Sequence, residues 1–404
     1  MPNMNIRHYF PFRRVKILNQ VIETKENRVM INMVPNNRFT PVCHVCGKPS
    51  RHVHAHETRQ VRDLPMAAFS VWLVCQYRKL LCNTCSKITT EDLGVFNPYQ
   101  RVTVRMAIYI HELCKMLTVK EVAEHLNLDW KTVKNIDKAF LMEQYAQTDY
   151  RNLRILAVDE IAIRKGHKYM TVVLDYETGR VVWMGKDRSS DTLKEFFKGM
   201  SEEQKQNLDA IAMDMWNPFI RAVRESVPHV KIVFDFFHVV SAFNKVIDKV
   251  RISEFNNAAK EDQEVFKGSK YLLLKNRPNL KTDEKAHLKK LQDINKNIFT
   301  MMLLKENLKR IWKYQKRGWA DNAIDIWCTL AHQIEHPEVE RFIGRLERYR
   351  YGILNHCEYP IHTSRLEGVN NKIKVIKRKA YGYHDKLYFT LKVKQAFDTT
   401  NDSN

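Results

Sequence analysis

The segment from residue 151 to about residue 240 constrains the fold most, because strand-like runs, turns and amphipathic stretches follow one another there in a definite order. The run LRILAVDEIAI predicts a strand, and KYMTVVLDYETGRVVWMGKD predicts a hairpin with a Glu-Thr-Gly-Arg turn. Two predicted helices, DTLKEFFKGM and NPFIRAVRESVP, then alternate with two predicted strands, NLDAIAMDMW and VKIVFDFFHVV. The resulting order, β-β-β-α-β-α-β, is that of a ribonuclease H-like core.

Acidic residues lie on or at the ends of these predicted strands. Asp159 is on the first strand and Asp214 ends the fourth, and the two strands are neighbours in a sheet of this order. Asp235 also ends an apolar strand, so the strand pattern alone leaves it as a rival of Asp214. If Asp214 is the ligand, Asp235 and His238 are expected at the rim of the site. Strand alternation sends Glu160 to the face opposite Asp159.

Carboxylates gathered in this way indicate metal-dependent phosphoryl transfer. Two Mg²⁺ (or Mn²⁺) ions held by carboxylate oxygens can activate a nucleophile and stabilise the leaving oxygen of an in-line displacement. The third carboxylate is expected from HTSRLEGVNNKIKVIKR, a predicted helix on which Glu367 is the only acid. The structural alternatives are an ion pair of Asp159 with Arg164 or Lys165, and a plain surface role for Glu367.

Two C-x-x-C pairs in the N-terminal part have the spacing of zinc knuckles. FSVWLVCQYRKLLC, which leads into the second pair, alternates as a strand does, so a hairpin can bring both pairs to one structural Zn²⁺. The expected ligands are Cys43, Cys46, Cys82 and Cys85. His52, His54 and His56 lie between the pairs and are alternative ligands, although exposure to solvent explains them more simply. A disulfide framework is not expected in a long cytosolic chain.

Helical periodicity begins at Thr103 and continues through two shorter segments, VKEVAEHLNL and WKTVKNIDKAFLMEQY, which Thr118 and Asp129 would cap. Two short helices joined by a tight turn form a helix-turn-helix, and the small Ala123 lies where they must pack closely. The first residues of the second helix would enter a DNA major groove. The candidate contacts are Trp130, Lys131, Thr132, Lys134 and Asn135.

Lysine and arginine outnumber aspartate and glutamate by 67 to 46, which implies a polyanionic partner, nucleic acid before membrane. Eight of these cations and one aspartate lie between Asn370 and Lys394, with aromatic residues interleaved, which favours DNA contact over a solvated basic face. The candidate contacts in this region are Arg365, Lys372, Lys374, Lys377 and Arg378. No apolar run approaches the ~20 residues that span a bilayer, and the first residues lack a signal-peptide pattern. A cytoplasmic protein is therefore expected.

The roughly 130 residues between Asp235 and Glu367 are predicted to be helical and to interrupt the core. Trp312, Trp319 and Trp327 in this segment are expected in its core rather than as base-stacking platforms. The predicted fold class is α+β and multidomain. Its expected parts are a zinc-binding ribbon (1–100), a helix-turn-helix DNA-binding domain (101–150), the first part of the ribonuclease H-like core (151–240), an all-helical insertion (241–355), and a core completion with the glutamate helix and the basic C-terminal segment (356–404).

Over almost its whole length, the chain resembles bacterial insertion-sequence transposases of the ISL-three (ISL3) family. The resemblance rests on the cysteine pairs and RQVRDLP, and on VDEIAIRKGHKYMTVVLD, TGRVV, AMDMWNPF, FDFFHVV and SRLEGVNNKIKVIKRKAYGY. It implies an N-terminal zinc-binding region, a helix-turn-helix, and a ribonuclease H-like core whose Asp-Asp-Glu triad falls on Asp159, Asp214 and Glu367. The family's Ser-Asn before the glutamate is Ser364-Arg365 here, so the role of residue 365 is open.

The resemblance implies binding to the terminal inverted repeats of an insertion sequence, followed by Mg²⁺-dependent cleavage and strand transfer into target DNA by a cut-and-paste route. Two DNA ends must be joined together, so a homo-oligomer, at least a dimer, is expected, associated with the bacterial nucleoid when on DNA. A zinc and helix-turn-helix regulator, or a catalytically dead remnant, would not need the triad. A structure-selective nuclease would not need two end-binding modules.

Overall fold

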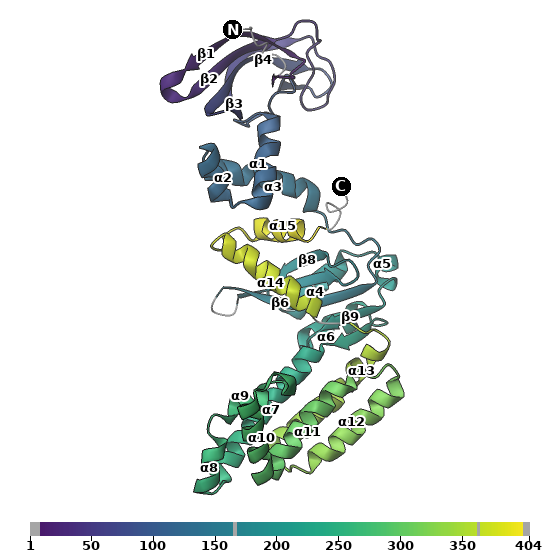
Figure 1. The fold of residues 1–404 in the computed structure, drawn as a ribbon. Helices are drawn as coiled ribbons and strands as arrows, with labels where there is room; N and C mark the ends of the chain where they lie inside the picture. The colour runs from purple at the N-terminus through teal and green to yellow at the C-terminus, as the bar shows by residue number, and fades with distance from the viewer. Residues whose placement is uncertain (1–8, 165–167, 362–363, 399–404) are drawn as a thin grey trace. The chain divides into compact units, whose positions relative to one another are not determined.

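The computed structural model describes residues 9–164, 168–361 and 364–398. By its internal contacts the chain divides into two compact units, Met1–Gln144 and Tyr145–Asn404 (Figure 1). Among the described helices, none is both long and apolar enough to cross a bilayer.

A five-stranded sheet opens the first unit. Its strands are β1 (Val15–Glu23), β2 (Arg28–Pro35), β3 (Val53–Met66), β4 (Phe69–Cys82) and β5 (Lys87–Thr90), with the short 3-10 helix η2 (Thr24–Glu26) between β1 and β2. The order is β1-β2-β4-β3, and β5 pairs with β4. Strand β4 has the bounds of the predicted strand FSVWLVCQYRKLLC. Its alternate residues Val71, Leu73, Cys75 and Tyr77 lie in the core of this unit, which explains the alternation in the sequence.

Three helices follow the sheet, namely α1 (Val104–Met116), α2 (Val119–Leu126) and α3 (Trp130–Tyr145). The predicted caps of α2 and α3 are confirmed. Thr118 and Glu121 form a capping box at the start of α2. The Asp129 carboxylate accepts the backbone N–H groups of Lys131 and Thr132 at 2.9 and 3.1 Å. Ala123 is buried among the helices, as the packing of a helix-turn-helix requires.

The second unit contains another five-stranded sheet, of order β10-β9-β6-β7-β8. Its elements are β6 (Ile155–Arg164), β7 (Lys168–Asp175), β8 (Val181–Lys186), α4 (Ser190–Lys198), α5 (Glu202–Gln206), β9 (Ala210–Met213), α6 (Asn217–Ser226) and β10 (Lys231–Phe234). Strands β6, β7 and β8 are antiparallel neighbours, whereas β9 and β10 run parallel to β6. The predicted strands are confirmed, including the end of the last one near Asp235, although FFHVV at the end of that apolar run belongs to a helix.

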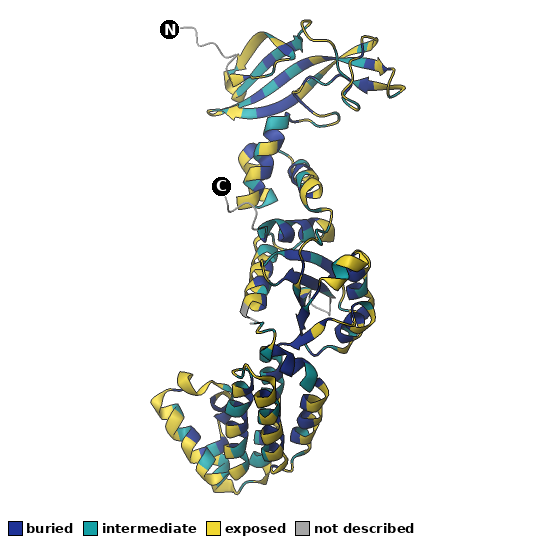
Figure 2. Cartoon of the chain, turned by 90° about the vertical axis from the view of Figure 1, so that its right-hand side faces the viewer, coloured by how far each residue is buried: buried dark blue, intermediate teal, exposed yellow. Residues whose placement is uncertain are grey.

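Helices cover both faces of this sheet, whose strands are mainly buried (Figure 2). Leu156 and Val158 of β6 pack into the core that includes residues of α4 and α6. Ala157 and Ile161, which point the other way, pack into a second core with residues of α14 (Ser364–Lys379) and α15 (Lys386–Ala396). Alternate residues of one strand therefore serve two different layers.

Seven helices connect β10 to the last two helices. They are α7 (Phe236–Asn257), α8 (Lys260–Phe266), α9 (Ser269–Leu274), α10 (Thr282–Ile294), α11 (Lys296–Ile311), α12 (Arg317–His332) and α13 (Pro337–Leu354), with the 3-10 helices η3 (Arg277–Asn279) and η4 (Asn355–Cys357). Trp327 is buried and Trp312 is half-buried, as predicted, but Trp319 is 62% exposed, so its predicted place in the core is wrong. Helix α7 runs across the expected boundary between residues 240 and 241.

The buried side chain of Lys305 links two of these helices. Its Nζ donates to the carbonyl oxygens of Leu273, Leu274 and Lys275, at 2.6, 2.9 and 2.9 Å. These carbonyls lie at the C-terminal end of α9, where helical partners are missing. The ammonium group, on a side chain in the middle of α11, therefore supplies the hydrogen-bond donors that the last carbonyls of α9 lack.

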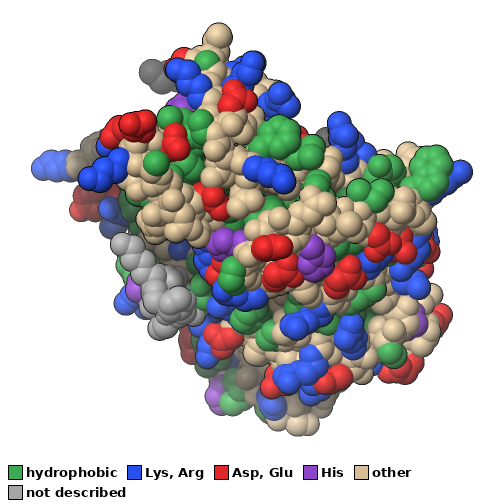
Figure 3. Space-filling model, turned by 90° about the horizontal axis from the view of Figure 1, so that it is seen from below, with side chains coloured by type: hydrophobic (Ala, Val, Ile, Leu, Met, Phe, Trp, Pro, Cys, Tyr) green, Lys and Arg blue, Asp and Glu red, His purple; other side chains and the backbone are tan. Residues whose placement is uncertain are grey.

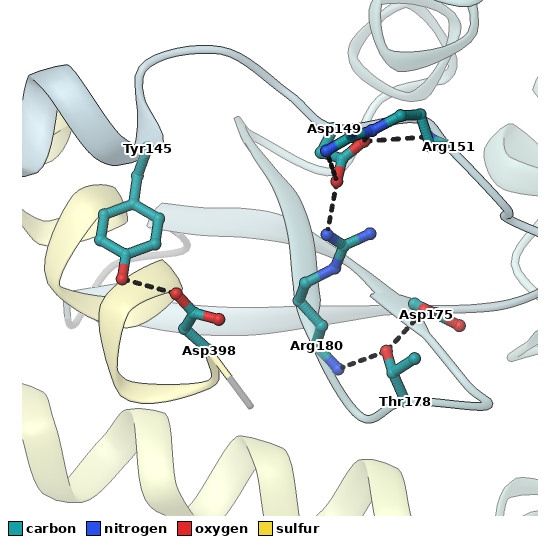
Figure 4. Close-up of polar contacts among 7 residues, drawn as sticks. All are labelled: Tyr145, Asp149, Arg151, Asp175, Thr178, Arg180 and Asp398. Atoms are coloured by element: carbon teal, nitrogen blue, oxygen red, sulfur yellow. Dashed lines mark hydrogen bonds and ion pairs between the residues drawn. The ribbon is translucent and has the colours of Figure 1, made fainter. Parts of the chain in front are cut away.

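Polar contacts tie the chain segment that enters the second unit to the rest of that unit (Figure 4). The Asp149 carboxylate accepts hydrogen bonds from Arg151 and from Arg180, the latter at 2.8 Å. These guanidinium groups, Arg151 first, hold the pKa of Asp149 well below its usual range. The Tyr145 hydroxyl donates to Asp398 at 2.8 Å, which joins the start of the unit to its C-terminal end.

Candidate active site

Three aspartates lie in a row at one end of the parallel strands. The parallel registers of β6 with β9 and of β9 with β10, continued past their last pairs, set Asp159 opposite Asp214 and Asp214 opposite Asp235. Neighbouring strands are about 4.8 Å apart. The predicted adjacency of the strands carrying Asp159 and Asp214 is therefore confirmed, and Asp235 is one strand further from Asp159.

Asp159 is held by two hydrogen bonds. One carboxylate oxygen accepts from the Asn370 side chain on α14 at 2.5 Å, and the other accepts the Glu160 backbone N–H at 2.8 Å. Burial raises the pKa of Asp159, and the nearby negative charge of Asp214 adds to this. The two hydrogen bonds and the neighbouring His238 act in the opposite direction without cancelling the effect. Ionised Asp159 thus lies in a place that favours a nearby cation.

His238 lies between the other two aspartates. Its Nδ1 is 3.3 Å from an oxygen of Asp214, and its Nε2 is 3.7 Å from an oxygen of Asp235. Asp235 is buried and also caps α7, because its other oxygen accepts the Phe237 backbone N–H at 2.6 Å. The cap explains why the apolar run FDFFHVV changes from strand to helix at this point.

Helix α14 places Glu367 beside this row. Leu366 and Val369 face the sheet, so Glu367 and Asn370, each one position further along, share the adjoining stripe of the helix. Residues three apart on a helix have Cβ atoms about 5–6 Å from each other. Because Asn370 contacts Asp159, Glu367 lies one helical turn from that contact. Its side chain is exposed.

The three carboxylates are not drawn into one tight cluster. In the part of the chain that the structure describes, the four N-terminal cysteines form the one group of three or more such residues whose ligand atoms all lie within 4.8 Å. The structure thus brings Asp159 and Asp214 together and leaves Glu367 at the edge of the site. Lys165, an alternative partner of Asp159, is outside the described residues, and the side chain of Arg164 is not described.

Glu160 points away from Asp159, as strand alternation predicted. It pairs with Arg188 at 3.3 Å, and the Arg188 guanidinium lies over the rings of Tyr169 and Trp216, at 4.3 and 4.7 Å from their centres. Burial and the adjacent Asp159 raise the pKa of Glu160. The sequence pattern does not predict the contacts of Arg188 with Glu160, Tyr169 and Trp216, nor the contact of Asn370 with Asp159. For Asn370, the one signal in the sequence is its position three residues after Glu367 on the same predicted helix.

Arg365 contacts the protein itself. Its guanidinium donates to the backbone carbonyls of Tyr176 and Glu177, in the turn between β7 and β8, the second at 3.1 Å. It therefore fastens the first turn of α14 to the sheet, a role that the sequence leaves open. Two further predicted DNA contacts, Lys372 and Lys377, also donate to backbone carbonyls of this unit. The remaining two, Lys374 and Arg378, have exposed side chains.

In the helix-turn-helix, the first turn of α3 presents several of the predicted contacts. Trp130 is 52% exposed, and the Lys131 ammonium lies 5.9 Å from the centre of its ring. Asn135 is exposed one turn further on, whereas Thr132 and Lys134 are half-buried. In a helix-turn-helix, the N-terminal residues of the second helix are those that contact base edges in the DNA major groove.

The four predicted zinc ligands come together in the first unit. The sulfur atoms of Cys43 and Cys85 are 3.9 Å apart, and those of Cys46 and Cys82 are 3.6 Å apart. Four thiolates at such distances match a tetrahedral Zn²⁺ site. The residue after each pair has positive φ, +67° at Gly47 and +53° at Ser86, which turns the chain back around the ion position.

The environment of Cys43 favours the thiolate that zinc requires. Burial opposes ionisation, but the hydroxyl of Thr89 and backbone N–H groups at the knuckle lower the pKa of Cys43 to about 6. The ligand group does not include a histidine, and the exposed side chains of His52, His54 and His56 agree with the simpler expectation for them.

Comparisons with known proteins match three successive regions of the chain. A family model described as transposase, of the ISL3 type, matches residues 156–393. Models described as the helix-turn-helix domain of transposase family ISL3 and the zinc-finger of transposase IS204/IS1001/IS1096/IS1165 match residues 91–141 and 40–85. These regions coincide with the candidate active site, the helix-turn-helix and the cysteine cluster, and together they define a transposase.

Individual transposases align along most of the chain. The transposase for insertion sequence element IS1001 of Bordetella parapertussis is 39% identical over 359 residues, which is 88% of each protein. The transposase for insertion sequence element IS1557 of Mycobacterium tuberculosis is 25% identical over 389 residues, covering 88% of this chain and 85% of that protein. The chain belongs to the ISL3 family of insertion-sequence transposases.

Proposed function

We propose that this transposase cuts and joins DNA with Asp159, Asp214 and Glu367 as its catalytic carboxylates, on a ribonuclease H-like core interrupted by helices α7 to α13. The observation that supports this most is the placement of Asp159 opposite Asp214, with α14 fastened over them through Asn370. The strand order β10-β9-β6-β7-β8, with the last two strands of the sequence parallel to the first, supports the fold assignment.

The donor set fits Mg²⁺ or Mn²⁺. Asp159 and Asp214 are neighbouring carboxylates, and burial makes the negative charge of Asp159 costly without a cation. Asp159, Asp214 and Glu367 would hold two ions, which would activate water or a sugar hydroxyl and stabilise the leaving oxygen. Asn370 keeps Asp159 oriented, and Arg365 keeps α14 in place on the sheet.

The first unit would recognise the terminal inverted repeats. Its helix-turn-helix presents Trp130, Lys131 and Asn135 at the start of α3, and a structural Zn²⁺ would hold the cysteine knuckles together. Cutting both ends of an element and joining them to one target requires at least two active sites, so a homodimer or larger assembly on the bacterial nucleoid is proposed. The exposed lysine and arginine of α14, Lys374 and Arg378, lie where phosphates near the active site can be contacted.

An end-cleavage assay tests the proposal. Labelled duplexes would carry the DNA that flanks this chain's own gene, and purified protein would be added with Mg²⁺ or Mn²⁺. D159N, D214N and E367Q keep side-chain size and remove charge, so each is expected to bind the end and to lower cleavage on the order of 10²–10³-fold or more. The matched control is D235N, because asparagine caps α7 as well as aspartate does.

Two results would contradict the proposal. A wild-type protein that binds these ends but never nicks them would remove the enzymatic assignment in favour of a DNA-binding regulator. If D235N abolished cleavage and D214N did not, the second catalytic aspartate would be Asp235.

A further inference from the structure

Three exposed arginines follow one face of α13. Arg341, Arg345 and Arg348 have the i, i+4, i+7 spacing that places side chains on the same side of a helix. Together with Met215, Trp216 and Asn217, they line a groove of about 590 Å³. The groove is therefore basic on one wall, and its other wall is the segment that directly follows Asp214.

A second hollow continues this groove toward α7. It measures about 220 Å³, shares Arg341 and Arg345 with the first, and adds Lys245 and Lys249. One acid lines it as well, Glu338, which pairs with Lys249 at 2.9 Å and with Arg341 at 2.8 Å. The two hollows together are thus lined by five cations and one carboxylate.

Gly344 forms the floor between the arginines. It lies inside α13 and is exposed, and a Cβ added there would meet nothing within 4 Å. Packing of this chain therefore does not require a glycine, although glycine weakens a helix interior. A glycine at such a place allows a ligand to approach the helix backbone closely.

The groove is fixed beside the candidate active site. The Tyr349 hydroxyl of α13 donates to the Asn217 side chain at 2.9 Å, so the start of α6 is held against α13. On the face seen in Figure 3, lysine and arginine side chains are interspersed with acidic ones, so the basic excess does not indicate a single binding surface there. The groove instead combines cations, an open floor and a wall made of the three residues that follow Asp214 in the sequence.

We propose that this groove binds the sugar-phosphate backbone of the DNA strand that enters the active site, an assignment that rests on the proposed function. Arginine forks pair with phosphate oxygens in two parallel hydrogen bonds. The seven residue steps from Arg341 to Arg348 span about 10 Å of helix, enough to follow two or three phosphates. Gly344 leaves room for the strand to lie against α13.

R345E and G344A test the groove in the full chain, with the same duplex ends as the probe. For R345E, the dependence of binding on salt is expected to fall by about 0.9 in log–log slope for each phosphate that the protein no longer neutralises. Hydroxyl-radical protection next to the cleavage position should disappear while protection of the inverted repeat remains, and cleavage should slow about 10- to 100-fold. K198E, an equal change of charge at an exposed site on α4, should behave as wild type.

G344A separates the groove from folding. Its melting temperature should stay equal or rise, because alanine favours a helix more than glycine does, while cleavage and protection near the cleavage position decrease. If both variants protect that position as wild type does, the proposal is overturned. It is also overturned if they keep DNA protection but lose self-association in light scattering, since the groove would then be a protein interface. Absence of cleavage by the wild-type protein would contradict the proposed function. Even then, hydroxyl-radical protection of the DNA end by wild type and variants would show whether the groove binds DNA.

Discussion

At the scale of single residues, Asn370 determines how Asp159 is presented. Its amide bonds one carboxylate oxygen at 2.5 Å, across 211 positions of sequence. Removing a hydrogen bond to a charged group costs about 1.5–3 kcal/mol. N370A is therefore expected to slow end cleavage about 10- to 100-fold and to raise the Mg²⁺ concentration required for half-maximal rate.

The metal requirement distinguishes this positioning role from a general loss of structure. DNA binding by N370A and its melting temperature should remain close to wild type, and N370S, which keeps a hydrogen-bond donor, should recover part of the rate. An unchanged metal requirement in N370A would show that Asn370 does not act through Asp159.

Residue-level prediction succeeds where the chemistry is carried by residue type. Paired cysteines predict the zinc centre, and the strand order predicts that Asp159 and Asp214 lie side by side. The strand pattern alone leaves Asp235 as a rival of Asp214, and the catalytic roles of these aspartates stay a prediction. Asn370 is not predicted, because a neutral polar residue on a basic helix carries no pattern of its own. Arg365 is expected on DNA, yet its guanidinium contacts two carbonyls of a turn that lies 188 positions earlier, a relation that only the fold creates.

At the scale of elements, the start of α3 depends on Asp129. Its carboxylate satisfies the N–H groups of Lys131 and Thr132, both of which lie in the predicted DNA-contacting turn. D129A should lower the free energy of unfolding of the first unit by about 1 kcal/mol and weaken binding to the inverted repeat. D129N should retain both properties, because asparagine is an equally good cap. Equal DNA affinity of D129A and wild type would argue against α3 as the recognition helix.

Helix α9 depends in a similar way on Lys305. K305M leaves three carbonyls at the end of α9 without their donor, and the loss is most costly at the buried carbonyl of Leu273. We expect a loss of about 1–3 kcal/mol in the free energy of unfolding of the second unit, measured by denaturant titration. K290M, at an exposed position of α10, should change it little. A K305M protein as stable as wild type would mean that the carbonyls find other partners.

Element boundaries are predictable where a cap or a turn residue marks them. Thr118 and Asp129 mark the starts of α2 and α3, and the predicted end of the last strand near Asp235 is confirmed. The helix that begins with FFHVV directly after that strand is not evident from the apolar run. A short apolar run does not reveal whether it is strand or buried helix. In the fold, only four residues form β10, and Asp235 then starts a 22-residue helix.

At the scale of the whole molecule, two compact units should unfold separately. Zinc removal affects only the first, because all four ligands lie between Cys43 and Cys85. Structural zinc contributes roughly 10–16 kcal/mol in small zinc-finger domains. Calorimetry with a chelator, or of C46S, should therefore show one transition lowered strongly and the other unchanged. A single transition that shifts as a whole would contradict the independence of the units.

The groove beside α13 shows what a sequence cannot predict at this scale. Its walls come from residues 215–217 and 341–349, which are over a hundred positions apart and share no motif. Helical periodicity predicts α13 itself, but the groove beside it exists only because the start of α6 is held against that helix.

The distance along the chain between the helix-turn-helix and Glu367, the proposed third carboxylate, also orders events in time. Glu367 follows Gln144 by 223 residues, which a ribosome adds in about 10–45 s at 5–20 residues per second. During that interval the nascent chain has a complete helix-turn-helix and lacks Glu367. With the roles proposed above for these two parts, a growing transposase is expected to bind a DNA end near its own gene before it is able to cut one.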